Sequence, residues 1–167
     1  MNCLQAAREM VQQIDDLIEK IPDADYQRPL PIFNGSSLGQ HFRHILNFYE
    51  CVLQVKDGDT IDYAKRNRDL MVETNPVYAR TSFSQLLQGL TLLKETDPVQ
   101  VKGDFNVNGE AVSSVLSSIG RELMYAFDHA VHHLAIIRIG LRDLEMESIM
   151  GSNQGVAPST TRHRKAS

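Results

Sequence analysis

Residues 117–142, SSIGRELMYAFDHAVHHLAIIRIGLR, indicate the fold class of this chain. Apolar residues recur through this stretch at the three- and four-residue spacing of an α-helix, and they occur on most of its faces. A helix with so many apolar faces is expected to lie at the centre of a helical protein. Two of its three histidines, at positions 129 and 133, project from one face, because residues four apart are neighbours on a helix.

Three further stretches have helical periodicity or helix-start signals, and together with the first they predict an all-α protein. These helices are predicted over residues 2–21, 37–55 and 75–94. Ser37 with Gln40 has the pattern of a capping box at a helix start. Asn75 followed by Pro76 marks another start, since proline suits the first helical position. Four long helices joined by loops predict a four-helix bundle.

The remaining segments are expected to be small additions to this bundle. Residues 22–35 contain three prolines and are predicted to form an extended loop. Val99-Gln100-Val101 alternates in polarity and Asn108-Gly109 is a tight-turn pair, which predicts a small β-hairpin before the last helix. We expect residues 1–150 to form the domain and residues 151–167, which lack periodicity, to form a C-terminal tail.

Composition and charge exclude several classes of protein. The 167 residues are 42% hydrophobic and 23% charged, which suits a single globular domain. A net charge of −4 and a pI of about 5.8 argue against a nucleic-acid partner. No apolar run approaches the roughly 20 residues that cross a bilayer, so no membrane partner is expected. The first residues lack the basic and apolar segments of a secretory signal, so we expect a cytoplasmic protein.

The histidines form the candidate site. His129 and His133 lie four residues apart on a helix, so their imidazoles can reach one metal ion at bonds of about 2.0–2.1 Å. A third ligand is expected from a facing helix, and both His41 and His44 lie on the predicted helix 37–55. Buried histidines that only hydrogen-bond within the core are the other interpretation of the same pattern.

Other polar residues are expected around the ligands rather than on the ion. Glu122 lies seven residues before His129, on the same face and about 10 Å along the helix axis. Arg66, Arg68 and Asp69 could line a pocket, but they are expected to pair with one another on the surface. The candidates for a supporting role beside the ligands are His41, Asn47, Glu122 and His132.

Two motifs give the chain a resemblance to a known family. Ser37-Leu-Gly-Gln-His-Phe-Arg-His44-Ile on one helix, with His129-Ala-Val-His-His133-Leu-Ala on the last, resembles the DinB/YfiT-like superfamily. The resemblance extends from the first helix to Leu141. It implies a four-helix bundle with one divalent metal ion on three histidines, one from the second helix and two from the last. By position in the motifs, the implied ligands are His44, His129 and His133.

The resemblance also implies a class of activity. Relatives include thiol S-transferases that use bacillithiol or mycothiol, a mycothiol-dependent maleylpyruvate isomerase, and metal-dependent hydrolases. We therefore expect a metal-dependent enzyme, a thiol S-transferase or a hydrolase, that acts on a small molecule such as a low-molecular-weight thiol. Zinc, nickel or iron would suit three imidazoles, and the resemblance implies a homodimer. The alternative is a non-catalytic helical bundle that acts as a binding or stress-response protein.

Overall fold

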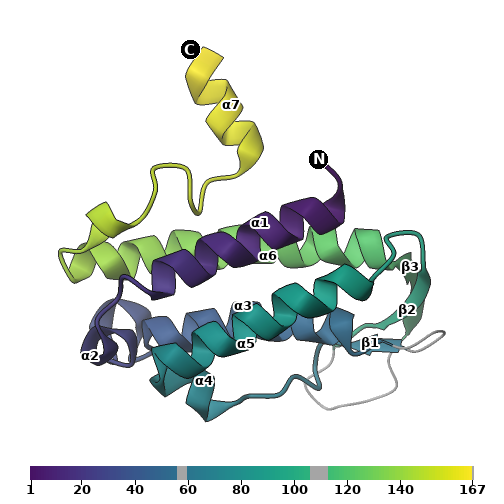
Figure 1. The fold of residues 1–167 in the computed structure, drawn as a ribbon, viewed down its shortest axis with the longest axis horizontal. Helices are drawn as coiled ribbons and strands as arrows, with labels where there is room; N and C mark the ends of the chain where they lie inside the picture. Colours follow the sequence, from purple (N-terminus) through teal and green to yellow (C-terminus); the bar gives the residue numbers. More distant parts are fainter. Residues whose placement is uncertain (56–59, 106–112, 167) are drawn as a thin grey trace.

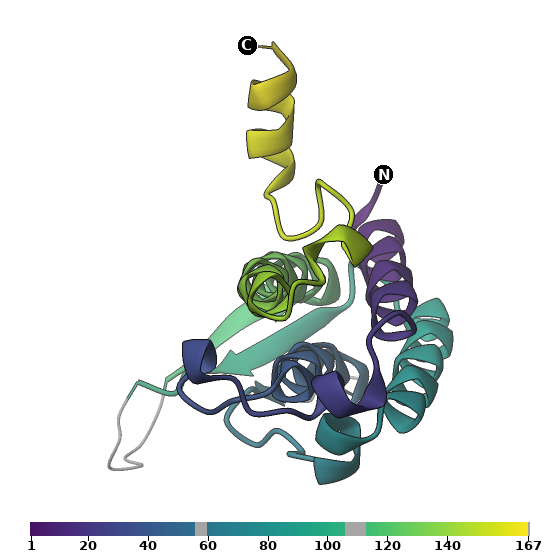
Figure 2. The same ribbon diagram turned by 90° about the vertical axis from the view of Figure 1, so that its left-hand side faces the viewer.

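The framework of the fold is a group of four long helices that lie side by side (Figure 1). The structure is a computed structural model that describes residues 1–55, 60–105 and 113–166. Helix α6 packs against α1 and α3, and α5 packs against the same two helices at the opposite corner (Figure 2). The predicted mostly helical fold is confirmed. The four helices are α1 (Cys3–Ile18), α3 (Leu38–Leu53), α5 (Pro76–Gly89) and α6 (Ile119–Asp143).

Each long helix begins at a side-chain cap that the sequence supplies. The four N-cap residues each accept a hydrogen bond from the backbone amide three residues further on, and they are Asn2, Ser37, Asn75 and Ser118. At α3 the amide oxygen of Gln40 also accepts a hydrogen bond from the Ser37 N–H at 3.3 Å, which completes the predicted capping box. A cap of this kind stabilises a helix by about 1 kcal/mol.

A three-stranded sheet lies at one end of the helices, which is one strand more than the small hairpin that the sequence predicts. The strands are β1 (Thr60–Asp62), β2 (Pro98–Lys102) and β3 (Ser114–Ser118), in the order β1-β2-β3. Strands β2 and β3 pair antiparallel, as the predicted hairpin requires, while β1 pairs parallel with β2. The predicted turn at Asn108-Gly109 lies outside the described residues. The parallel strand was missed because three residues are too few to establish an alternation, and their pairing partner lies about forty positions away.

Two predicted irregular segments contain short helices. Residues 22–35 are not a plain extended loop, because they include α2 (Asp23–Tyr26) and the 3₁₀ helix η1 (Pro31–Phe33). The C-terminal segment forms α7 (Pro158–Ala166), which stands away from the four long helices in both views (Figures 1 and 2). Arg138 fixes the start of this segment, since its guanidinium donates hydrogen bonds to the carbonyls of Gly151 and Gln154 at 2.6 and 2.8 Å.

The other short helical elements connect the framework. They are α4 (Leu70–Thr74), η2 (Leu90–Leu92) and η3 (Glu147–Ile149). Within the ranges 1–55, 60–105 and 113–166, no helix is both long and apolar enough to cross a membrane.

A close backbone contact fixes α3 against α4. A Cβ atom on Gly39 would collide with the carbonyl oxygen of Glu73 and the ring of Tyr26, so this position admits only glycine without a shift of the helices. Two further bonds join the same region. The Tyr26 hydroxyl donates a hydrogen bond to the Val72 carbonyl at 2.7 Å, and Arg43 pairs with Glu73 at 2.9 Å. The first turns of α3 are therefore held firmly in place.

Candidate metal centre

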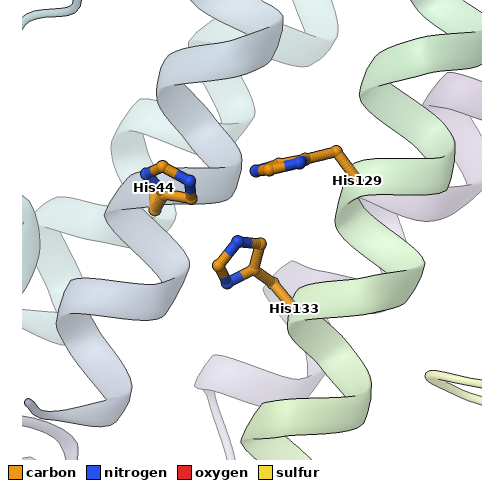
Figure 3. A group of neighbouring side chains, drawn as sticks. All are labelled: His44, His129 and His133. Carbon is orange, nitrogen blue, oxygen red and sulfur yellow. The ribbon is translucent and has the colours of Figure 1, made fainter. Parts of the chain in front are cut away.

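Three histidines from two facing helices meet in the interior of the helix group. His44 lies in the middle of α3, and His129 and His133 lie on the facing side of α6 (Figure 3). Each ring offers a nitrogen, and these three nitrogens all lie within 4.8 Å of one another. The ring centroids of His44 are 4.9 Å from His129 and 4.5 Å from His133. This arrangement could hold one metal ion.

The three imidazoles are held in the neutral form at neutral pH. Burial is the main cause, and it lowers the pKa of His44 and His129 to about 4 and that of His133 to about 3. Neighbouring groups add to the effect, because His129 and Arg66 oppose a positive charge on His44. A metal ion binds the lone pair of a neutral imidazole, so these rings need lose no proton to become ligands.

One nitrogen of the cluster has no hydrogen-bond partner among the residues that the structure describes. His129 Nε2 is buried, and no group in the described part of the chain hydrogen-bonds to it. A buried polar atom without a partner costs about 1–3 kcal/mol. The ring is also held rigidly, since Phe48 stacks on it with ring centroids 3.7 Å apart. A metal ion would satisfy this nitrogen, so the donor set fits such an ion.

His41 lies beside the cluster. Its Nδ1 is 3.1 Å from Nδ1 of His133, which is hydrogen-bonding distance between the two rings. The group of three nearby nitrogens includes His44 and not His41. Spacing alone allowed either His41 or His44 as the third ligand from this helix. The group of nearby nitrogens includes His44, while His41 contacts that group through His133.

The other predicted supporting residues take different positions. His132 is exposed and touches His133 edge-on, with ring centroids 5.5 Å apart. Asn47 is buried, and its amide donates a hydrogen bond to the carboxylate of Glu50 at 2.9 Å. The structure thus gives the Asn47 amide a partner within its own helix. Burial raises the pKa of Glu50, while the hydrogen bond from Asn47 opposes that effect.

Glu122 is buried at the start of α6, away from the three histidines. It accepts a hydrogen bond from the Tyr63 hydroxyl at 2.7 Å and another from the Ser117 hydroxyl at 2.5 Å. Burial and this bond raise the pKa of Tyr63 well above its ordinary value. The helical spacing predicted that Glu122 lies on the same face as the histidines, but it did not predict the hydrogen bond from Tyr63 to Glu122.

A pocket of about 500 Å³ lies where the start of α6 meets the sheet, and we call it the sheet pocket. Phe48 forms a shared wall, because it lines the pocket and also stacks on His129. Arg66 lines this pocket rather than pairing with Asp69, whose carboxylate caps α4 and accepts from Tyr78. Aromatic and charged side chains make up much of its lining, among them Phe48, Tyr63, Arg66, Lys102, Arg121, Glu122 and Tyr125.

Comparison with known proteins adds two findings. The sequence model of the DinB family matches residues 2–150. The chain is also similar to the FK506-binding protein 5 of Rhizopus delemar, with 27% identity over 108 residues. That similarity covers 63% of this chain but 28% of the fungal protein, so the chain spans little more than a quarter of the length of that relative. No solved structure is significantly similar to this chain.

Proposed function

Because the chain belongs to the DinB family, we propose that it is a metal-dependent enzyme in which His44, His129 and His133 hold one divalent ion. The observation that carries this proposal is the buried Nε2 of His129, which has no hydrogen-bond partner in the described chain although two further imidazoles lie close to it. Zinc, nickel and iron all suit such a donor set. The helices α1, α3, α5 and α6 form the four-helix bundle of the DinB/YfiT type in this proposal.

The proposed chemistry is thiol transfer or hydrolysis on a small molecule. A divalent ion with three protein ligands keeps an open position, where it supplies Lewis acidity that makes water or a thiol a better nucleophile. His41 positions His133, because its contact with Nδ1 leaves Nε2 of His133 as the nitrogen for the ion. Phe48 covers one side of His129 and keeps water from that face.

The alternative, a non-catalytic bundle with a structural histidine cluster, predicts a different arrangement. A structural cluster should be dry, with each ring hydrogen-bonded to protein. Here the rings of His44, His129 and His133 are only half-buried, and His129 Nε2 has no such bond among the residues described. A pocket also lies directly behind Phe48. These observations favour the enzyme.

Metal content is the direct test. We expect about one equivalent of divalent metal in the purified wild-type protein by elemental analysis, and loss of that metal in His44→Ala and His133→Ala. His132→Ala is the matched control, because this ring is exposed and lies next to a proposed ligand. A wild-type protein without metal after incubation with nickel and zinc salts would reject the proposal.

The two reactions are separated by a second assay on the metal-loaded protein. Thiol transfer predicts faster loss of a low-molecular-weight thiol in the presence of 1-chloro-2,4-dinitrobenzene. Hydrolysis predicts release of p-nitrophenol from p-nitrophenyl acetate without a thiol. In either case the rate should fall to background in His44→Ala and stay unchanged in His132→Ala.

The remaining expectations stay predictions. We propose that residues 1–150 form the metal-binding domain and that residues 151–167 are an appended tail. A homodimer, a cytoplasmic location and the lack of a nucleic-acid partner likewise await measurement.

A further inference from the structure

Aromatic rings form one wall of the sheet pocket. Phe48 and Tyr63 stack with ring centroids 5.1 Å apart, and Tyr125 meets them edge-on at 5.7 and 5.4 Å. Such a wall offers flat apolar surface to an organic molecule. The volume of about 500 Å³ lies in the range of small-molecule pockets in proteins.

Two cationic side chains that line the sheet pocket form ion pairs with carboxylates. Lys102 forms an ion pair with Asp62 at 3.3 Å, and Arg121 forms one with Glu122 at 3.3 Å. Arg66 lies over the face of Phe48, with its guanidinium carbon 5.1 Å from the ring centroid. Across residues 1–55, 60–105 and 113–166, no carboxylate forms an ion pair with Arg66.

Glu122 does not supply the missing partner. Its side chain is 2% exposed, and its two oxygens accept hydrogen bonds from the hydroxyls of Tyr63 and Ser117 and from Arg121. Asp104 also lines the pocket, but it is exposed to solvent. The Arg66 guanidinium thus keeps unused donors inside a pocket with an aromatic wall.

We infer that the sheet pocket binds a small organic acid, whose carboxylate pairs with Arg66 and whose apolar body lies against Phe48, Tyr63 and Tyr125. The planar fork of a guanidinium matches a carboxylate with two parallel hydrogen bonds. Naming this acid as the substrate rests on the proposed function. The binding itself needs only the residues of the pocket.

The position of the pocket suits a substrate of the three-histidine site. Arg66 lies over Phe48, and Phe48 stacks on His129 at 3.7 Å between ring centroids. A carboxylate on Arg66 therefore lies close to the histidines, with one aromatic ring between the two sites.

The test compares two probes that differ in charge, 2-naphthoate and 2-naphthalenemethanol. Binding of each to the full-length protein is measured by isothermal titration calorimetry, after removal of metal with a chelator so that the carboxylate meets no ion. We expect 2-naphthoate to bind wild type at least about tenfold more tightly than the alcohol, as a charge-assisted hydrogen bond predicts. Arg66→Met, which keeps an apolar stem, should bring the two affinities within about threefold of each other.

Arg68→Met is the matched control, because Arg68 is exposed and lies outside the pocket. It should keep the wild-type preference for the acid. The inference is overturned if the acid does not bind, if wild type binds both probes equally, or if Arg66→Met keeps the preference. Metal content is measured separately, so a protein that prefers the acid but takes up no metal would reject the proposed function alone.

Discussion

Lowering the pH from 7.5 to 5 should destabilise the metal-free protein, because its half-buried histidines take up protons when the chain unfolds. The pKa is about 4 for His44 and His129 and about 3 for His133, and burial is the main cause in each case. All three values lie below the ordinary value of 6.5, so the unfolded chain binds more protons below that pH. The free energy of unfolding therefore falls as the pH falls from about 6.5 toward about 4.

The size of the effect follows from these shifts. For a histidine whose pKa is 6.5 in the unfolded chain and about 4 in the folded protein, the free energy of unfolding is lower by about 2 kcal/mol at pH 5 than at pH 7.5. The three rings keep some contact with water, which screens their charges, so we expect about 3 kcal/mol for the cluster as a whole. Urea unfolding followed by circular dichroism at both pH values, with a chelator present, measures this loss.

A single variant isolates the contribution of the cluster. His133→Gln removes one of the three titrating rings, so the loss between pH 7.5 and 5 should shrink by about 1 kcal/mol. Other groups that titrate in this range, such as Glu50, are present in both proteins and cancel in the comparison. His132→Gln, at an exposed position, should reduce the loss less than His133→Gln does, because His132 acts only through its effect on the pKa of the neighbouring rings. Equal losses in wild type and His133→Gln would refute the reasoning.

Three further changes test other parts of the structure by urea unfolding at pH 7.5. Tyr63→Phe removes a hydrogen bond to the buried Glu122 and should cost about 1–2 kcal/mol. Ser37→Ala removes the hydroxyl half of the α3 capping box and should cost about 1 kcal/mol. Deletion of residues 158–167 should change the free energy of unfolding by less than about 0.5 kcal/mol, because residues 158–166 bury no side chain.

Each of these changes has a control. Tyr125→Phe alters a hydroxyl on a half-exposed neighbour of Tyr63 and should cost less than Tyr63→Phe. Ser148→Ala, at an exposed serine outside the capping box, should be near neutral. A deletion of 158–167 that lowers stability by more than about 1 kcal/mol would contradict the view that α7 stands apart from the core.

The helices and the ligand candidates could be predicted because their signals are local. Periodic apolar residues, the Ser37–Gln40 box and the Asn75-Pro76 start act within a few positions of the chain. The spacing of His129 and His133 likewise fixes their common face on one helix. The structure then separates His44 from His41, which spacing alone left open, through the group of nitrogens that includes only the former.

The assembly of the sheet pocket could not be predicted, because the roles of its residues depend on partners distant in the sequence. Tyr63 and Arg66 lie in a segment without periodicity. They become pocket residues only because β1 pairs with β2, which brings that segment to the start of α6. The hydroxyl of Tyr63 meets a carboxylate 59 positions later in the chain. No local sequence pattern predicts such a contact, and a parallel strand of three residues is too short to be recognised from alternation.

The contact at Gly39 has a consequence for protein design. To transplant the three histidines onto another helical scaffold, it is not enough to copy His44, His129 and His133. The direction in which the His44 side chain points depends on how α3 is rotated about its axis. The close contact of Gly39, in the first turn of α3, with Glu73 and Tyr26 sets that rotation. A recipient scaffold must therefore carry a glycine five residues before the first proposed ligand, with the backbone of a neighbouring helix packed directly against it.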